Sequence, residues 1–149
     1  MERLDCHVFI PDDTFFEEEI IITGDLIAGN NVTVRDNISV GGDVFFGDKA
    51  NIYDIASGSD VIFGKDADVC NIDTGSNVTI GNNATINTIE AIGDISIGDD
   101  SSIFDINAGG NVTIGDNADA CYIKAGRDVF IGEISRIEDI TAEGIIFKK

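Results

Sequence analysis

The sequence has little proline, tryptophan, histidine or cysteine, and each shortage narrows the classes of protein to which the chain can belong. Its 149 residues include 1 Pro, 1 His, 3 Cys and no Trp. Three cysteines are too few for the disulfide framework of a small secreted domain, and they include no Cys-x-x-Cys pair typical of zinc sites. The one candidate for a histidine base, His7, lies before the first apolar segment. We therefore expect no enzyme, no metal site and no cofactor.

Positive charge and long apolar runs are also scarce. The chain carries 9 Lys and Arg against 28 Asp and Glu, which gives a formal net charge of -19. Such a surface repels nucleic acids and anionic membranes, so neither is expected as a partner. No run approaches the ~20 apolar residues of a membrane-spanning helix, and the polar start has no signal-peptide core. We expect a cytoplasmic protein that does not insert into a membrane.

What the sequence has in abundance is a repeat with a period of 17 residues. Isoleucines mark the start of successive rows at Ile38, Ile55, Ile72, Ile89, Ile106, Ile123 and Ile140. A column of glycines follows in the same register at Gly47, Gly64, Gly81, Gly98, Gly115 and Gly132. A fixed period of this length indicates structural units that stack on one another and share a continuous core.

Each row contains three short stretches in which apolar and polar residues alternate. In the row that begins at Ile106 they are 106–108, 112–114 and 118–120. Alternation with a period of two predicts strands whose first and third residues point inward. Gly, Asp and Asn between the stretches predict turns with positive φ. The sequence therefore predicts an all-β, parallel β-helix with three short strands per 17-residue coil and about eight coils.

The repeat covers nearly the whole chain, so a single domain over residues 1–149 is expected. Before Ile38 the pattern continues one residue out of phase. We expect a flexible tail at 1–7, an irregular first coil at 8–21 and regular coils at 22–147.

Two outward residues, Phe45 and Ile62, follow one another in the same column and predict an exposed apolar patch. Two interpretations remain open. The patch is either a lateral contact surface or a surface covered by the N-terminal segment, with Phe16 as the covering residue.

A column of acidic and amide residues also has two interpretations. It comprises Asp43, Asp60, Asn77, Asp94, Asn111 and Asp128. These side chains either bond to the turns or form a row of weak cation sites, and we favour the turns. Cys70 and Cys121 occupy one column three coils apart, about 14 Å along the axis, which is too far for a disulfide.

Both ends of the chain are apolar and show no helical cap. The last residues, 144–149, combine an apolar strand with two lysines. The unpaired strand edges of a solenoid invite pairing with another chain, so end-to-end association is expected.

The short rows without helices resemble the bactofilins, a family of polymer-forming cytoskeletal proteins. The segments that carry the resemblance are Ile22-Thr23-Gly24-Asp25-Leu26 and Gly42-Asp43-Val44-Phe45-Phe46-Gly47. The resemblance implies a right-handed helix that polymerises through symmetric, nucleotide-independent joints. It places the polymerisation interface in the terminal coils, at Val8, Phe9, Phe15, Phe16, Ile145, Ile146 and Phe147.

Other interpretations stay open at this point. Glu17, Glu18 and Glu19 at one end and Lys148 and Lys149 at the other favour head-to-tail joints instead. A non-polymerising binding module is an alternative function. So is a protein like the left-handed hexapeptide acyltransferases, whose repeats the segment 114–118 resembles, although their coils have about 18 residues.

Overall fold

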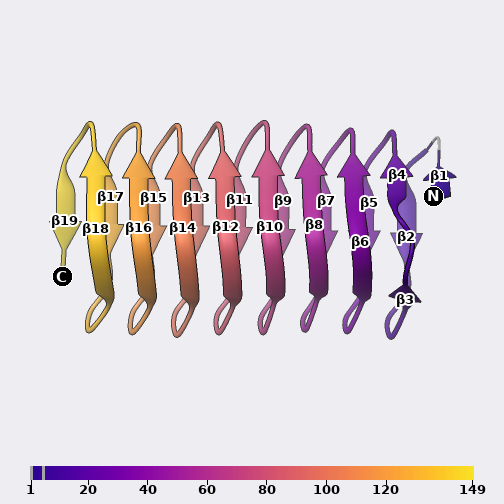
Figure 1. Cartoon of the computed structure of the whole chain (residues 1–149), viewed down its shortest axis with the longest axis horizontal. Coiled ribbons are helices and arrows are strands. Elements are labelled where there is room, and N and C mark those ends of the chain that lie inside the picture. The colour runs from indigo at the N-terminus through magenta and orange to yellow at the C-terminus, as the bar shows by residue number, and fades with distance from the viewer. Residues whose placement is uncertain (1, 5) are drawn as a thin grey trace.

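The computed structural model describes residues 2–4 and 6–149, and they form one solenoid with the two termini at opposite ends (Figure 1). In Figure 1 the strands in front point upward and those behind point downward, while the chain advances from right to left. This arrangement is a right-handed coil, the hand opposite to that of the hexapeptide acyltransferases. The all-β, single-domain solenoid of about eight coils is thus confirmed.

Two parallel sheets form the walls of the solenoid. The ten-stranded sheet contains β1 (Glu2–Leu4), β3 (Phe15–Phe16), β4 (Ile20–Ile22), β6 (Thr33–Val40), β8 (Asn51–Ser57), β10 (Asp68–Thr74), β12 (Thr85–Ala91), β14 (Ser102–Ala108), β16 (Asp119–Ala125) and β18 (Arg136–Ala142). The nine-stranded sheet contains β2 (Val8–Ile10), β5 (Leu26–Ala28), β7 (Val44–Phe46), β9 (Val61–Phe63), β11 (Val78–Ile80), β13 (Ile95–Ile97), β15 (Val112–Ile114), β17 (Val129–Ile131) and β19 (Ile146–Lys148).

A regular coil contains two strands, so the prediction of three strands per coil is wrong. The third stretch of one row and the first stretch of the next join into a single strand of 7 residues, such as β16. Within β16, Ala120 and Ile123 point inward, and the two residues between them, Cys121 and Tyr122, are not buried. Two successive outward residues make a corner without a loop, and the strand also continues through the equivalent corner of β14, at Phe104 and Asp105.

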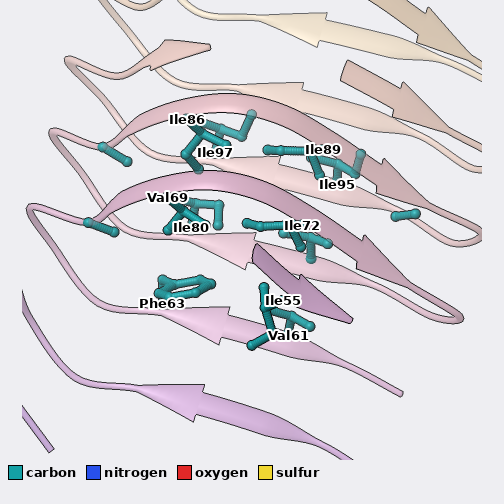
Figure 2. Close-up of a cluster of buried hydrophobic side chains, with 14 of the residues drawn as sticks. Ile55, Val61, Phe63, Val69, Ile72, Ile80, Ile86, Ile89, Ile95 and Ile97 are labelled. Carbon is teal, nitrogen blue, oxygen red and sulfur yellow. The ribbon is translucent and has the colours of Figure 1, made fainter. Parts of the chain in front are cut away.

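Ladders of identical or similar side chains fill the core (Figure 2). Ile55, Ile72 and Ile89 stack in register across β8, β10 and β12 and are buried. Phe46 and Phe63 are also buried, and their rings stack with centroids 5.1 Å apart. Each coil therefore hides its apolar face against the coils on either side, as the predicted inward columns require.

The first coils depart from the 17-residue spacing. Val8 pairs with Leu26 and Leu26 with Val44, so that these coils contain 18 residues. The strict spacing begins where Asn37 pairs with Asp54, after a register shift between Val34 and Asn37 in β6. One extra residue is absorbed at this bulge, which explains the phase slip in the sequence.

Residues 2–4 form strand β1, which pairs with β4 along its whole length. The expectation of a flexible tail over residues 1–7 is therefore wrong for these residues. Met1 and Asp5, which belong to the same expectation, lie outside the described residues. Leu4 packs against the core, and its contact with the first coil explains why this segment is ordered as a strand.

Asn and Asp occupy most of the positions with positive φ, and the glycines do not supply the positive φ that the sequence suggested. The residues with positive φ are Asp13, Asn31, Lys49, Asp66, Asn83, Asp100, Asn117 and Ile134, and no described glycine has one. Gly81 is required for a different reason. A Cβ at this position would lie 2.6 Å from the carbonyl oxygen of Gly64 in the neighbouring coil.

Replacing Ile134 with asparagine is expected to stabilise the protein. Ile134 has φ 61°, where a β-branched side chain is strained, and Asn117 occupies the same turn one coil earlier. The relief of strain is expected to raise the free energy of unfolding by about 1 kcal/mol, measured by urea denaturation. Ile134→Val keeps the branch and serves as the control, with unchanged stability. An Asn variant no more stable than the parent contradicts this explanation.

Candidate assembly site

The C-terminal end of the solenoid is an open end. Strands β18 and β19 each pair on one side only, with β16 and β17. The inward columns of the last coil end in Ile137, Ile140 and Ala142, which are only partly buried, and in Ile146, which is 49% exposed. Their equivalents one coil earlier are buried. Apolar surface that a further coil covers elsewhere is therefore accessible to solvent at this end.

Of the three residues predicted at this end, Ile146 alone belongs to an inward column. Ile145 lies in the turn before β19 and is 71% exposed. Phe147 points outward and contacts Phe130, with ring centroids 6.5 Å apart. Lys148 pairs with the buried Ile131 and thus continues an inward column, which makes one corner of this end basic.

The sequence reasoning missed Ile137, Ile140 and Ala142. The signal that could have found them was present, because they are the last members of the columns that define the repeat. Hydrophobicity alone favours Phe147 instead.

At the N-terminal end, too, some of the predicted residues pack against the core and others face outward. Val8 and Phe16 are partly buried and pack against the core, together with Leu4. Phe9 is exposed on the outer side of β2. The Arg35 guanidinium carbon lies over the Phe15 ring, 5.1 Å from the ring centroid. Val8, Phe16 and Leu4 therefore form the apolar surface of this end, whereas Phe9 and Phe15 face sideways. Leu4 lies in the segment for which the sequence predicted a flexible tail, so the sequence did not point to it.

The predicted lateral patch is exposed. Phe45 and Ile62 are 46% and 39% exposed, and they are paired neighbours in the outer column of the nine-stranded sheet. Phe16 cannot cover them, because it pairs with Val34 in the other sheet. The described N-terminal residues instead lengthen the column, since Ile27 and Phe9 occupy the next two positions.

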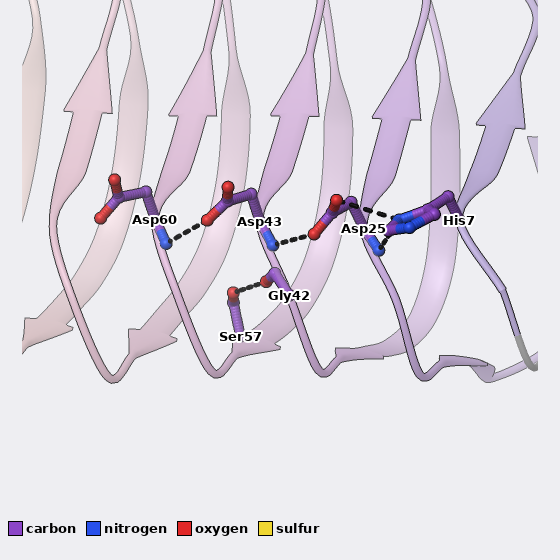
Figure 3. Close-up of polar contacts among 6 residues, drawn as sticks. All are labelled: His7, Asp25, Gly42, Asp43, Ser57 and Asp60. Atoms are coloured by element: carbon purple, nitrogen blue, oxygen red, sulfur yellow. Dashed lines mark hydrogen bonds and ion pairs between the residues drawn. The ribbon is translucent and has the colours of Figure 1, made fainter.

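A ladder of side-chain hydrogen bonds joins successive turns (Figure 3). The Asp25 carboxylate accepts a bond from the Asp43 N–H at 2.9 Å, and the Asp43 carboxylate accepts one from the Asp60 N–H at 3.1 Å. The same pattern continues through Asn77, Asp94, Asn111 and Asp128 to the N–H of Ile145. The column therefore bonds to the turns, as favoured from the sequence.

His7 occupies the head of this ladder in place of an Asp or Asn. Its Nδ1 lies 3.1 Å from the Asp25 backbone nitrogen, which donates to it, and 2.9 Å from the Asp25 carboxylate. At the other end Ile145 has no side-chain acceptor, so the ladder stops there. The polar ladder thus runs nearly the full length of the rod and ends at the apolar C-terminal coil.

Comparison with family models, with curated proteins and with solved structures finds no match.

Three further features concern metals, membranes and cysteines. Within the described part of the chain, no three or more His, Cys, Asp or Glu side chains lie together as a metal site would need. No helix among the same residues is long and apolar enough to cross a membrane. Cys6, Cys70 and Cys121 are free thiols.

The pKa of Asp60 lies below its ordinary value. The main cause is a side-chain hydrogen bond from Ser76, followed by the ladder bond from the Asn77 N–H, while burial opposes them. Hydrogen bonds of this kind stabilise the carboxylate form. The folded state therefore gains stability from Asp60 above its ordinary pKa of 3.8 and loses it as the pH falls below that value.

Replacing Asp60 with asparagine is expected to make stability less sensitive to acid below pH 3.8. An amide oxygen can accept the same backbone bond without titrating, as Asn77 does for the Asp94 N–H at 2.8 Å. The measurement is an acid titration of circular dichroism at fixed urea. Asp73→Asn, on the outer side of β10, removes the same charge outside the ladder and is the control. Superimposable acid transitions for Asp60→Asn and the parent contradict the prediction.

Proposed function

We propose that the protein is a structural, cytoplasmic rod that assembles end to end with further copies of itself into filaments or scaffolds. The observation that carries the proposal is the open C-terminal end, where Ile137, Ile140, Ala142 and Ile146 leave the inward columns incomplete. The N-terminal coil presents a second apolar end through Leu4, Val8 and Phe16.

The coil-to-coil contact within the chain is the physical basis for assembly. Every internal coil pairs its backbone with a neighbour on both sides and buries its inward side chains between them. A second copy stacked on an end would form the same kind of contact, with the same hydrophobic gain and the same pairing of backbone groups. Such a joint needs no nucleotide, because no step consumes chemical energy. The resemblance to bactofilins supports the same function.

Negative-stain electron microscopy of the purified protein without nucleotide tests the proposal. We expect unbranched filaments with an axial repeat of about 40 Å per copy, from the spacing of stacked strands. Images at low and high salt distinguish a missing joint from a joint that charge repulsion suppresses. The net charge of -19 opposes association most strongly at low salt. Separate short rods at both salt concentrations would exclude end-to-end assembly.

A further inference from the structure

Four outward side chains form a continuous apolar stripe along the outer face of the nine-stranded sheet. They are Phe9, Ile27, Phe45 and Ile62, which pair directly with one another in that order. Their exposed fractions fall from 70% at Phe9 to 39% at Ile62. Four rungs of parallel strand give the apolar stripe a length of about 14 Å.

The fold does not require apolar residues at these positions. The same outer column continues with Thr79, Ser96 and Thr113 in β11, β13 and β15, where the strands and coils are equally regular. Thr is a good strand former, so strand propensity does not explain Phe and Ile in the first four rungs. A contiguous exposed apolar patch with a sharp boundary at Ile62 indicates a binding surface.

A row of carboxylates flanks one side of the apolar stripe. Asp25, Asp43 and Asp60 lie in the turns that precede β5, β7 and β9, and Figure 3 shows them in line along successive coils. On the other side, Asp12 and Asp48 follow β2 and β7 in a second ladder, whose positions after β5 and β9 hold Asn30 and Lys65. An apolar strip with a continuous acidic rim on one side fits a ligand with an apolar face and a basic flank.

We propose that the apolar stripe is a docking site for a basic, amphipathic helical segment of a partner protein. About ten residues of α-helix span 15 Å, and their apolar side chains at i, i+3, i+4 and i+7 would lie along the four rungs. Lysine or arginine beside them would meet the flanking carboxylates. A second copy of this chain fits less well, because it would bring two acidic rims together. The site lies on the side of the rod, so it goes beyond end-to-end assembly and stays accessible in a filament.

The test uses a fluorescein-labelled peptide of about 18 residues, with leucines along one helical face and lysines elsewhere, in anisotropy titrations. Phe45→Thr/Ile62→Thr leaves the net charge unchanged and introduces a residue that the same column already contains. We expect this pair to weaken binding about tenfold or more, since it removes much of the buried apolar area. Phe130→Thr, in the same column outside the apolar stripe, is the matched control and should bind like the parent. Asp43→Asn/Asp60→Asn keeps the ladder acceptors and should weaken binding and its salt dependence.

Three results would overturn the proposal. One is equal affinity of the parent and Phe45→Thr/Ile62→Thr for the lysine peptide, which includes the absence of any binding. Another is equal affinity of the parent for a peptide with glutamate in place of every lysine. The third is side-by-side association of the parent in sedimentation experiments that Phe45→Thr/Ile62→Thr abolishes, because a second copy would then be the occupant.

Discussion

Replacing Ile146 with lysine is expected to abolish filament growth while leaving the rod folded. Ile146 ends an inward column at the open C-terminal end and is half exposed in the single chain, so a lysine there can reach water. In an end-to-end joint the same side chain would be enclosed between two coils. Burying an uncompensated charge costs about 3 kcal/mol or more, which shifts the concentration required for assembly by more than a hundredfold.

Thr141→Lys is the matched control for this prediction. It adds the same charge to the same terminal coil, but Thr141 points outward in a column that already holds Lys124. Pelleting and electron microscopy should show filaments for Thr141→Lys and the parent, and no species larger than a dimer for Ile146→Lys. Filaments of normal length from Ile146→Lys would show that the C-terminal end is not part of the joint.

The size of the Ile146→Lys product also reports the polarity of the joints. If joints are symmetric, as the resemblance to bactofilins implies, the intact N-terminal ends still meet and dimers remain. If joints are head to tail, as the charges at the two ends favour, every joint needs a C-terminal end and the variant is a monomer.

Replacing Gly81 with alanine is expected to lower the stability of the rod strongly. The new Cβ would lie 2.6 Å from the carbonyl oxygen of Gly64 and 2.9 Å from the backbone nitrogen of Lys65. Both atoms belong to the backbone of the neighbouring coil, which cannot rotate away as a side chain could. The Gly81 N–H also bonds to the carbonyl of Phe63 at 3.0 Å, which holds the two coils together at this point.

The coil must therefore separate locally from its neighbour, with loss of pairing and packing on both sides of the turn. We expect the free energy of unfolding to fall by about 3 kcal/mol or more, measured by urea denaturation. Thr79→Ala, two residues earlier on the outer face of β11, should cost less than about 1 kcal/mol. A Gly81→Ala variant within that same range would show that the coils are less tightly stacked than the structure indicates.

The repeat predicted most of the fold because a stacked solenoid converts periodicity directly into contacts. The isoleucine column from Ile38 to Ile140 became a ladder of paired inward residues, and the acidic column became a ladder of hydrogen bonds. The corner at Cys121 and Tyr122 was harder to predict, because its equivalents hold turn residues, such as Asp105 in β14, and the backbone nevertheless continues through it as one strand. The glycine column was visible, but its cause, the distance between coils, is a property of the assembled structure.

The residues of the proposed assembly site were harder to predict than the fold. At the C-terminal end, hydrophobicity alone does not distinguish Ile146 from Phe147. Ile146 belongs to an inward column, whereas Phe147 points outward. Their distinction depends on the alternation of the strand and on which residues pair with Val129 and Phe130. Similarly, the apolar stripe was seen only as Phe45 and Ile62, because the 18-residue spacing of the first coils hid its continuation to Ile27 and Phe9.

The uninterrupted 17-residue spacing after Asn37 also makes rod length a discrete quantity. Duplication or deletion of one whole coil within that region changes the length by about 4.8 Å and leaves every column in register. An insertion of an odd number of residues inside a strand instead turns inward residues outward in the positions that follow until a bulge corrects the phase. The length of the rod can therefore change in equal steps without any change at either end.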